Sequence, residues 1–352
     1  MIRPNSILSV MQTATALAMI QARTNLNTNV STAATAGNDL SADMKVYYDM
    51  QLLRDAEPHL VHRQFGKKAT IPQGTGKTIE FRRFADLPRN LTPLTEGVTP
   101  NGMSLDVAAI TAMVKQYGGY VATSDILVMT AIDNIMSEAV QLLGSNAGIV
   151  LDTLCRNVLL TGTNVMYAND SATGSAISAR ADLLQTANLT VREVSRAVTI
   201  LRQQNAPTLD GSYVAIAHPN VIHELMANSE DGWMDITKYT RLDDALTGEV
   251  GKCMGVRFVE STQAKVFGGA SSEDSAVYGT LFIGQGAYGV IDLEGGGLQT
   301  IAKARGSAGT SDPLNQRATV GWKAVEATKI LVPQYLLRVE SCVRDFGDQP
   351  EN

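Results

Sequence analysis

The sequence predicts an α+β fold organised around one long helix, and three observations lead to that prediction. Apolar residues recur at steps of three and four between residues 131 and 161, which is the stripe of a single helix. Residues 69–84 and 107–123 have the alternating pattern of strands on either side of a long connection. Residues 190–300 alternate helical and extended segments, and a strand-rich segment follows them. At 352 residues the chain is long enough for two compact parts.

The composition restricts the class of protein. A formal net charge of −6 leaves no overall basic surface for tight binding to nucleic acid. Residues 63–89 are an exception, because seven basic residues face two acidic ones there, a net charge of 7 − 2 = +5. Such a stretch is either the solvated face of a strand or a patch that meets an acidic surface of another subunit. Charged residues make up only 18% of the chain. This low fraction fits a protein that buries much of its surface in contacts with partners, and it fits equally a protein rich in polar uncharged loops.

The cysteines and the N-terminal segment indicate where the protein assembles. Cys155, Cys253 and Cys342 are odd in number and far apart, so they predict neither a disulfide framework nor a zinc site and suit a reducing cytoplasm. No apolar run is long enough to span a membrane. Residues 1–22 resemble a signal peptide weakly, because polar residues interrupt the apolar run after Arg3. Residues 1–40 are poor in large apolar side chains, and we expect an extension that is flexible or ordered on assembly.

The N-terminal third predicts a helix followed by a projecting ribbon. A helix is expected from Ser41 until Pro58 breaks it. Beyond it, the strands within 69–84 and 107–123 enclose about 20 residues without periodicity, rich in proline and glycine. Gly118 and Gly119, within the second strand, indicate a bulge or a close backbone approach. An isolated two-stranded ribbon is only marginally stable in water, so a neighbouring subunit is the simplest candidate to cover it.

The rest of the chain predicts the body. The long helix is expected to begin at a capping box over residues 130–133 and to end at Gly162, with Gly144 and Gly148 weakening or kinking it. A second capping box, Thr190 with Glu193, opens a helix that reaches residue 204. Further elements are expected in the following order: strand 213–217, a helix from 219 through 226, strands near 256, 277–283 and 287–293, and strands over 318–324, 328–332 and 335–342.

Catalytic and binding motifs are not found. Residues 73–78 (QGTGKT) resemble a phosphate-binding loop, but the first glycine of that motif is replaced by Ile71 and a strand follows instead of a helix. We therefore expect a hairpin turn there. His59 and His62 have a spacing that could share a metal, yet no further ligand stands at a matching position, and ordinary polar histidines are the more frequent case. We predict no catalytic residues, no cofactor and no metal, and a protein that is not an enzyme.

Four segments resemble a known family of shell proteins. The order of the elements is similar to that of the Hong Kong 97-type major capsid proteins of tailed phages. The local match is to those of phages related to enterobacteria phage N-four, and it extends over roughly residues 40–345. It rests on residues 42–48 (ADMKVYY), 77–84 (KTIEFRRF), 92–100 (TPLTEGVTP) and 114–120 (VKQYGGY), with additions at 151–154 (LDTL) and 161–164 (TGTN). Residues 1–39 depart from it.

The resemblance implies an assignment of domains. Residues 1–40 would be an N-terminal extension, 41–65 an N-arm, and 66–122 the extended β-hairpin loop that lies over an adjacent subunit. Residues 123–189 and 301–352 would form the peripheral domain with a spine helix at 130–162, and residues 190–300 the axial domain.

The resemblance also implies contacts between subunits and a function. Contacts of the extended loop are expected at Phe81, Arg82, Arg83, Phe84, Pro93, Leu94, Thr95, Glu96 and Gly97, and contacts of the N-arm at Tyr47, Tyr48 and Leu52. The implied function is a major capsid protein that self-assembles, as hexamers and pentamers, into the icosahedral head that encloses double-stranded DNA. Its implied partners are portal, scaffold and decoration proteins and loosely held DNA, with no membrane, and its implied location is the virion, after assembly in the host cytoplasm. The alternatives are the shell of a cellular encapsulin-type nanocompartment and an enzyme of unrelated class.

Overall fold

A computed structural model of the chain describes residues 42–84, 87, 89–93, 96–97, 99, 102–130, 135–227, 233–235, 248–268, 275–307, 312–344 and 349–352. The predicted N-terminal extension, residues 1–40, and the predicted first turn of the long helix, residues 131–134, lie outside them. Of the described helices, none is long and apolar enough to cross a membrane.

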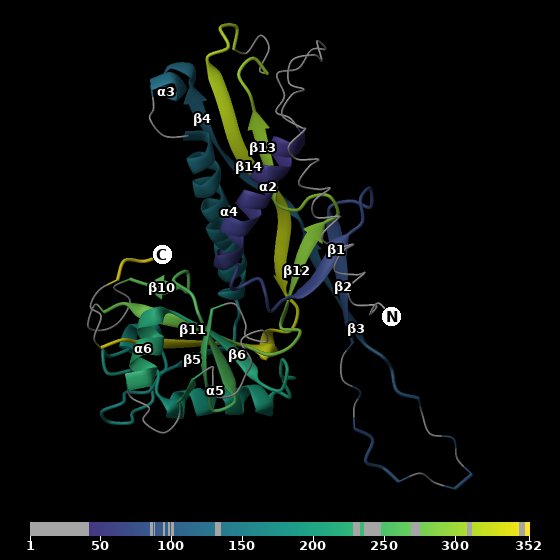
Figure 1. Cartoon of the computed structure of the whole chain (residues 1–352). Coiled ribbons are helices and arrows are strands. Elements are labelled where there is room, and N and C mark those ends of the chain that lie inside the picture. The colour runs from purple at the N-terminus through teal and green to yellow at the C-terminus, as the bar shows by residue number, and fades with distance from the viewer. Residues whose placement is uncertain are drawn as a thin grey trace, which may run out of the picture.

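Two sheets make up the molecule, and Figure 1 shows them at its two ends. The elongated end is a five-stranded sheet, and the compact end is an eight-stranded sheet flanked by short helices. The five-stranded sheet has the order β1 (Lys67–Ile71), β12 (Tyr288–Leu293), β14 (Arg317–Ile330) and β13 (Gln299–Lys303), with β4 (Lys115–Ser124) also paired to β14. The eight-stranded sheet has the order β5 (Val165–Tyr167), β15 (Leu336–Cys342), β11 (Val277–Ile283), β6 (Tyr213–Ala217), β9 (Val256–Glu260), β8 (Glu249–Cys253) and β7 (Trp233–Asp235), with β10 (Val266–Phe267) also paired to β11.

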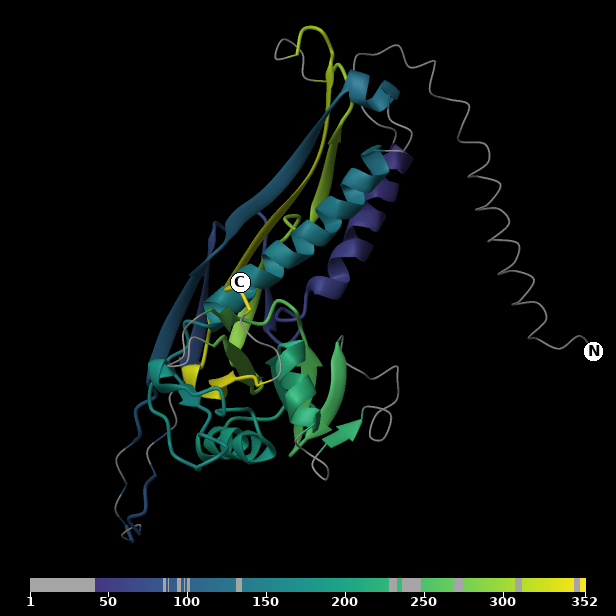
Figure 2. The ribbon, with the colours of Figure 1, turned by 90° about the vertical axis from the view of Figure 1, so that its left-hand side faces the viewer.

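Two helices pack side by side on one face of the five-stranded sheet, as Figures 1 and 2 show. α2 (Ala42–Ala56) is the helix predicted before Pro58, and a 3-10 turn, Glu57–His59, follows it. α4 (Ile135–Leu159) is the predicted long helix. Leu52 of α2, Leu151 of α4 and Trp322 of β14 belong to one buried cluster. The indole Nε1 of Trp322 donates a hydrogen bond to Oδ1 of Asn146 at 3.2 Å, so the large ring is buried with its polar atom satisfied.

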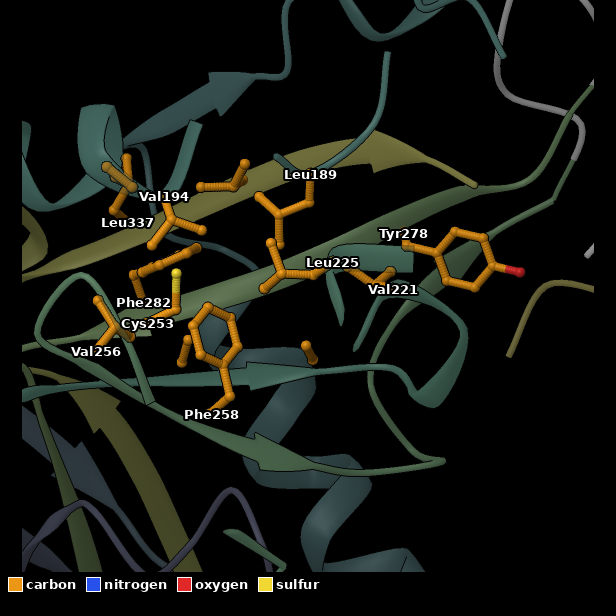
Figure 3. Packing of buried hydrophobic residues seen from close by; sticks show 14 of the residues in the cluster. Leu189, Val194, Val221, Leu225, Cys253, Val256, Phe258, Tyr278, Phe282 and Leu337 are labelled. Atoms are coloured by element: carbon orange, nitrogen blue, oxygen red, sulfur yellow. The ribbon is translucent and has the colours of Figure 1, made fainter. Parts of the chain in front are cut away.

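The eight-stranded sheet forms the core of the compact end. Figure 3 shows Phe258 of β9 and Phe282 of β11 packed among side chains from α5 (Val191–Gln203) and α6 (Pro219–Ala227). Thr190 caps α5 as predicted, because its hydroxyl oxygen accepts a hydrogen bond from the backbone N–H of Glu193. The helix–strand–helix order predicted for this region is confirmed, and β6 and β11 have the predicted bounds.

The region around the long helix differs from the prediction at both of its ends. The single strand predicted over residues 107–123 is two strands, β3 (Val107–Met113) and β4, which lie in different sheets. A short helix, α3 (Asp125–Thr130), follows β4. Thr130 is the last described residue of this helix, and its hydroxyl donates to the carbonyl oxygen of Ile126. The rest of the capping box predicted over residues 130–133 lies outside the described residues. α4 ends at Leu159, and the turn to Gly162 follows it.

The sheets divide the chain differently from the predicted domain boundaries. β12 falls within the predicted axial domain, residues 190–300, but it pairs with β14 in the five-stranded sheet. β5 and β15 fall within the predicted peripheral domain, yet both belong to the eight-stranded sheet. The chain therefore crosses between the two ends more often than predicted, because strands far apart in sequence complete each sheet.

Candidate subunit interface

The projecting hairpin consists of β2 (Thr78–Phe84), β3 and the residues between them. The two strands pair with each other alone, in antiparallel register from Thr78 opposite Met113 to Phe84 opposite Val107. The described residues of the connection extend beyond the body, as Figures 1 and 2 show. The predicted two-stranded ribbon is thus confirmed in kind, but it is shorter than predicted because β1 and β4 pair elsewhere.

The base of the hairpin packs on its own subunit. Ile79 and Phe81 share one face of β2, as predicted, and lie against a buried cluster that contains Ile291 of β12. The ring of Phe81 also approaches Gly289, where a Cβ atom would lie 3.2 Å from it. Phe81 is therefore a half-buried anchor of the hairpin on its own subunit, and its expected contact with another subunit stays a prediction. The pattern placed Phe81 on an apolar face but left open what covered that face.

The far part of the hairpin has no cover from the described part of its own chain. Every described residue between 82 and 109 is exposed, including Phe84, Pro93, Glu96 and Gly97 from the predicted set. Leu94 and Thr95 lie outside the described residues. The large apolar side chains in this part are Phe84, Leu87, Leu91, Met103, Leu105 and Val107, each 49–88% exposed. Several large apolar side chains exposed on one segment are typical of an interaction site.

The two arginines of the predicted contact set have different surroundings. Arg82 is exposed and lies 3.3 Å from the carboxylate of Glu80 on the same strand. Arg83 donates to the side-chain oxygen of Gln334 in its own subunit at 3.2 Å. Exposed polar contacts of this kind contribute little to stability. Both guanidinium groups could therefore break these contacts and bind another partner.

The N-arm prediction is corrected for two of its three residues. Leu52 is 0% exposed and Tyr48 is 8% exposed, because both fill the core between α2, α4 and the sheet. Only Tyr47, at 60%, presents its ring to the exterior. The sequence pattern missed Met50 and Leu53, which are also at least half exposed on α2. The helix carries apolar residues of its own on every face. Periodicity alone therefore does not separate its buried face from its exposed one.

A buried polar junction fixes the segment between the N-arm and the hairpin. The Nδ1 atom of His62 lies 2.7 Å from Oδ2 of Asp152 on α4, and the backbone N–H of His62 donates to Oδ1 at the same distance. The hydroxyl of Tyr288 on β12 donates to the carbonyl oxygen of His62. Arg63 pairs with Asp292 on β12 and lies 3.3 Å from Glu326 on β14. Residues 62 and 63 are therefore held by the long helix and by two strands.

Burial raises the pKa of two groups in this junction, the hydroxyl of Tyr288 and the carboxyl of Glu326. Glu326 is 3% exposed, and burial raises the pKa of its carboxyl to about 7, with Arg63 acting in the opposite direction and the charges of Asp292 and Asp152 adding to the rise. The junction is packed and hydrogen-bonded on several sides, which is the character of a structural anchor.

The remaining candidate motifs of the sequence have structural roles. Residues 72–76 form a turn between β1 and β2 in which Gly74 and Gly76 have φ of 85° and 105°, but the two strands belong to different sheets, so the expected hairpin turn is corrected. His59 and His62 have separate partners, because the ring of His59 lies 3.1 Å from the hydroxyl of Ser145. Among the described residues, no three histidine, cysteine or acidic side chains gather as metal ligands would.

Comparison with solved structures identifies this architecture. The fold is similar to the capsid of Ralstonia phage GP4, with a TM-score of 0.66 and 15% identity over 92% of this chain and 98% of that chain. It is also similar to the capsid of cyanophage P-SCSP1u, with a TM-score of 0.56 and 15% identity over 80% and 87% of the two chains. The capsid of cyanophage Pam1 gives a TM-score of 0.57 at 14% identity over 78% and 87%. No curated protein matches the sequence.

The elongated five-stranded end, the compact eight-stranded end, the long helix and the projecting hairpin define a shell protein with the Hong Kong 97-type capsid fold. A family model described as phage capsid protein matches residues 107–339, more than half of the chain. The chain belongs to this family. It is a phage capsid protein, a structural component of the virion.

Proposed function

We propose that this capsid protein assembles as hexamers and pentamers into an icosahedral head around double-stranded DNA, and that its extended loop, residues 66–122, lies over an adjacent subunit. The observation that carries this proposal is the row of exposed apolar side chains on a hairpin that its own subunit leaves uncovered. Removing such surface from water is the main driving force for association of protein subunits.

The elements take their places in the shell accordingly. The five-stranded sheet with α2 and α4 would be the peripheral domain, and the eight-stranded sheet the axial domain around the capsomer centre. Tyr47, Met50 and Leu53 give the N-arm a second apolar contact surface. The matching segments 42–48, 77–84, 92–100 and 114–120 support a relation to the capsid proteins of phages like N-four. Portal, scaffold and decoration proteins would be further partners, and contact with DNA would be loose because the chain is acidic overall.

Deleting residues 86–103 tests the proposal. The deletion leaves four residues between Phe84 and Val107, a length that closes a hairpin readily. We expect a folded subunit that melts at the temperature of the unassembled wild-type subunit, because every described residue removed is exposed. We expect no shells in electron micrographs. Light scattering should report a species no heavier than the 37.6 kDa of one full-length chain.

Thr99→Ser, which keeps the loop length and changes an exposed residue of the same loop, is the matched control and should assemble. Shells built by the deletion variant would contradict the proposed role of the loop. A deletion variant that cannot fold would show that the loop belongs to the core of its own subunit.

A further inference from the structure

Residues 349–352 lie beside β10 and the lower end of α4, as Figures 1 and 2 show. Cys342, the last residue of β15, pairs with Val277 of β11, and Phe267 of β10 pairs with the same residue from its other side. Cys342 and Phe267 are therefore about two strand spacings, roughly 10 Å, apart. The six residues between Cys342 and Gln349 are long enough to cover that distance, so residues 349–352 reach β10 within their own chain.

The side-chain amide of Asn352 finds both a donor and an acceptor in the backbone near β10. Its Oδ1 accepts a hydrogen bond from the backbone N–H of Val266 at 3.0 Å, and its Nδ2 donates to the carbonyl oxygen of Ala264 at 2.9 Å. The backbone N–H of Asn352 donates to the carbonyl oxygen of Val266 at 3.4 Å. A side-chain amide can donate and accept at once, whereas an ionised carboxylate only accepts and an apolar side chain does neither. This position therefore favours asparagine.

Arg156, in the last turn of α4, binds the same asparagine. It is 3% exposed, and its Nη1 donates to the carbonyl oxygen of Gln263 at 2.7 Å and to Oδ1 of Asn352 at 3.1 Å. Its Nη2 donates to the main-chain oxygen of Asn352 at 3.3 Å. A buried guanidinium is costly unless its donors are satisfied, and these contacts satisfy part of them. One side chain of the long helix is thus bonded both to the compact end and to residues 349–352.

The charges on the two sides of this contact are opposite. The Nζ atom of Lys265 lies 2.7 Å from Oε1 of Glu351 and donates to the main-chain oxygen of Asn352 at 2.5 Å. The hydrogen bond from Lys265 holds the pKa of the Glu351 carboxyl below its usual range, and the charges of Lys265 and Arg180 act in the same direction. Residues 345–352 contain three acidic residues and no basic one. An acidic segment therefore meets a basic surface.

Gly268 leaves room for the backbone of the segment. A Cβ atom at this position would lie 3.0 Å from the backbone nitrogen of Glu351 and 3.5 Å from the carbonyl oxygen of Gln349. A side chain there would press on the main chain of residues 349–351, which would have to shift to make space. The surface thus fits the backbone of this segment as well as the side chains of Glu351 and Asn352.

We propose that Arg156, Lys265 and the backbone of residues 263–266 form a peptide-binding site, and that residues 349–352 are its tethered ligand. The bound segment clamps the compact end onto the last turn of α4. A ligand held by a short stretch of chain has an effective concentration on the order of millimolar, so contacts that are weak one by one still keep the site occupied. Site and ligand belong to a single subunit, and the inference therefore goes beyond the proposed function and does not depend on it.

Amide exchange in unassembled subunits tests the site with a peptide added in trans. A variant lacking residues 349–352 should exchange about tenfold faster over residues 263–268, because the backbone N–H of Val266 loses the acceptor that protects it. A synthetic peptide with the sequence of residues 345–352, at roughly millimolar concentration, should restore slow exchange. The same peptide with Asn352→Ala should not, since it lacks the amide that bonds Val266 and Ala264.

The full chain gives the same readout without a deletion. Asn352→Ala should speed exchange over residues 263–268, whereas Gln349→Ala, at an exposed position of the same segment, is the matched control and should leave it unchanged. Equal restoration by the two peptides, or exchange that neither the deletion nor Asn352→Ala changes, would overturn the site. If the deletion variant does not fold, the comparison of Asn352→Ala with Gln349→Ala decides the question alone.

Discussion

Two glycines of α4 set how closely α2 approaches it. A Cβ atom on Gly144 would lie 2.9 Å from the carbonyl oxygen of Leu52, and one on Gly148 would lie 2.5 Å from that of Ala56. Glycine in a helix costs about 1 kcal/mol relative to alanine. Here the backbone contact between α2 and α4 offsets that cost. The sequence predicted that these glycines weaken or kink the long helix, and it did not predict this contact.

Gly148→Ala should therefore destabilise the subunit although alanine favours a helix. Overpacking costs about 1–3 kcal/mol, which exceeds the roughly 1 kcal/mol gained in helix propensity. Urea denaturation of unassembled subunits measures the change. Gly102→Ala is the control, because no atom lies within 4 Å of its added Cβ, and it should leave the free energy of unfolding unchanged. A Gly148→Ala variant more stable than the wild type would refute the close approach.

Glu326 gives the subunit a pH dependence with a defined sign. The folded state holds the proton of this carboxyl up to a pKa of about 7, against 4.5 for the free group. Its contribution to stability is therefore full below pH 4.5 and is lost as the pH rises toward 7. Glu326→Gln removes the cost of the buried charge, so the variant should be more stable than the wild type by about 3 kcal/mol above pH 7 and nearly equal to it at pH 4.5.

Denaturation at a series of pH values between 4.5 and 8 compares the two proteins. Glu294→Gln, which makes the same substitution at an exposed acid just beyond β12, is the control. Stability curves for wild type and Glu326→Gln that run parallel across this range would show that Glu326 does not titrate as inferred.

At the scale of elements, the hairpin is divided into an anchored base and a free end. Val114 separates β3 from β4, and its backbone N–H donates to the carbonyl oxygen of Lys77 at 3.0 Å. β3 then stays with β2 while β4 joins β14. Ile79 and Phe81 attach the base to the face of the five-stranded sheet opposite α2 and α4. The direction of the projecting end therefore depends on these two side chains.

Phe81→Ala should release the hairpin without unfolding the body. Loss of part of a half-buried ring costs about 1–2 kcal/mol locally, which corresponds to amide exchange about 5–30 times faster in peptides covering residues 78–84 and 107–113. Phe84→Ala, on the exposed end of the same strand, is the control and should leave exchange unchanged. Equal exchange in both variants would mean that the base is not anchored through Phe81.

At the scale of the whole molecule, the described part of the subunit leaves large apolar side chains exposed on several elements. The hairpin, the outer side of α2 and the short helix α3 all present large apolar residues, including Leu91, Met50 and Ile126. Assembly that covers them stabilises the folded state by mass action. The melting temperature of the wild type should accordingly rise with protein concentration, and that of the variant lacking residues 86–103 should not.

Several features followed from the sequence because they are local. The bounds of β6 and β11, the cap of α5 at Thr190 and the end of α2 before Pro58 are set by neighbouring residues and their intrinsic preferences. The two-stranded ribbon and its long connection were also predictable, because alternating apolar residues and a run rich in proline and glycine identify them. Similarity of short segments to capsid proteins then identified the fold and the family.

Only the tertiary structure decided which surfaces are covered. Tyr48 and Tyr47 are neighbours in an apolar helix, yet one is buried and the other exposed, because α4 and the sheet lie on one side of α2 alone. Gly118 and Gly119 fit a bulge or a close approach in the sequence, and the regular register of β4 with β14 selects the close approach. Such outcomes depend on strands about 200 residues away, such as β14 beside β4, and the residues of a single segment do not contain that information.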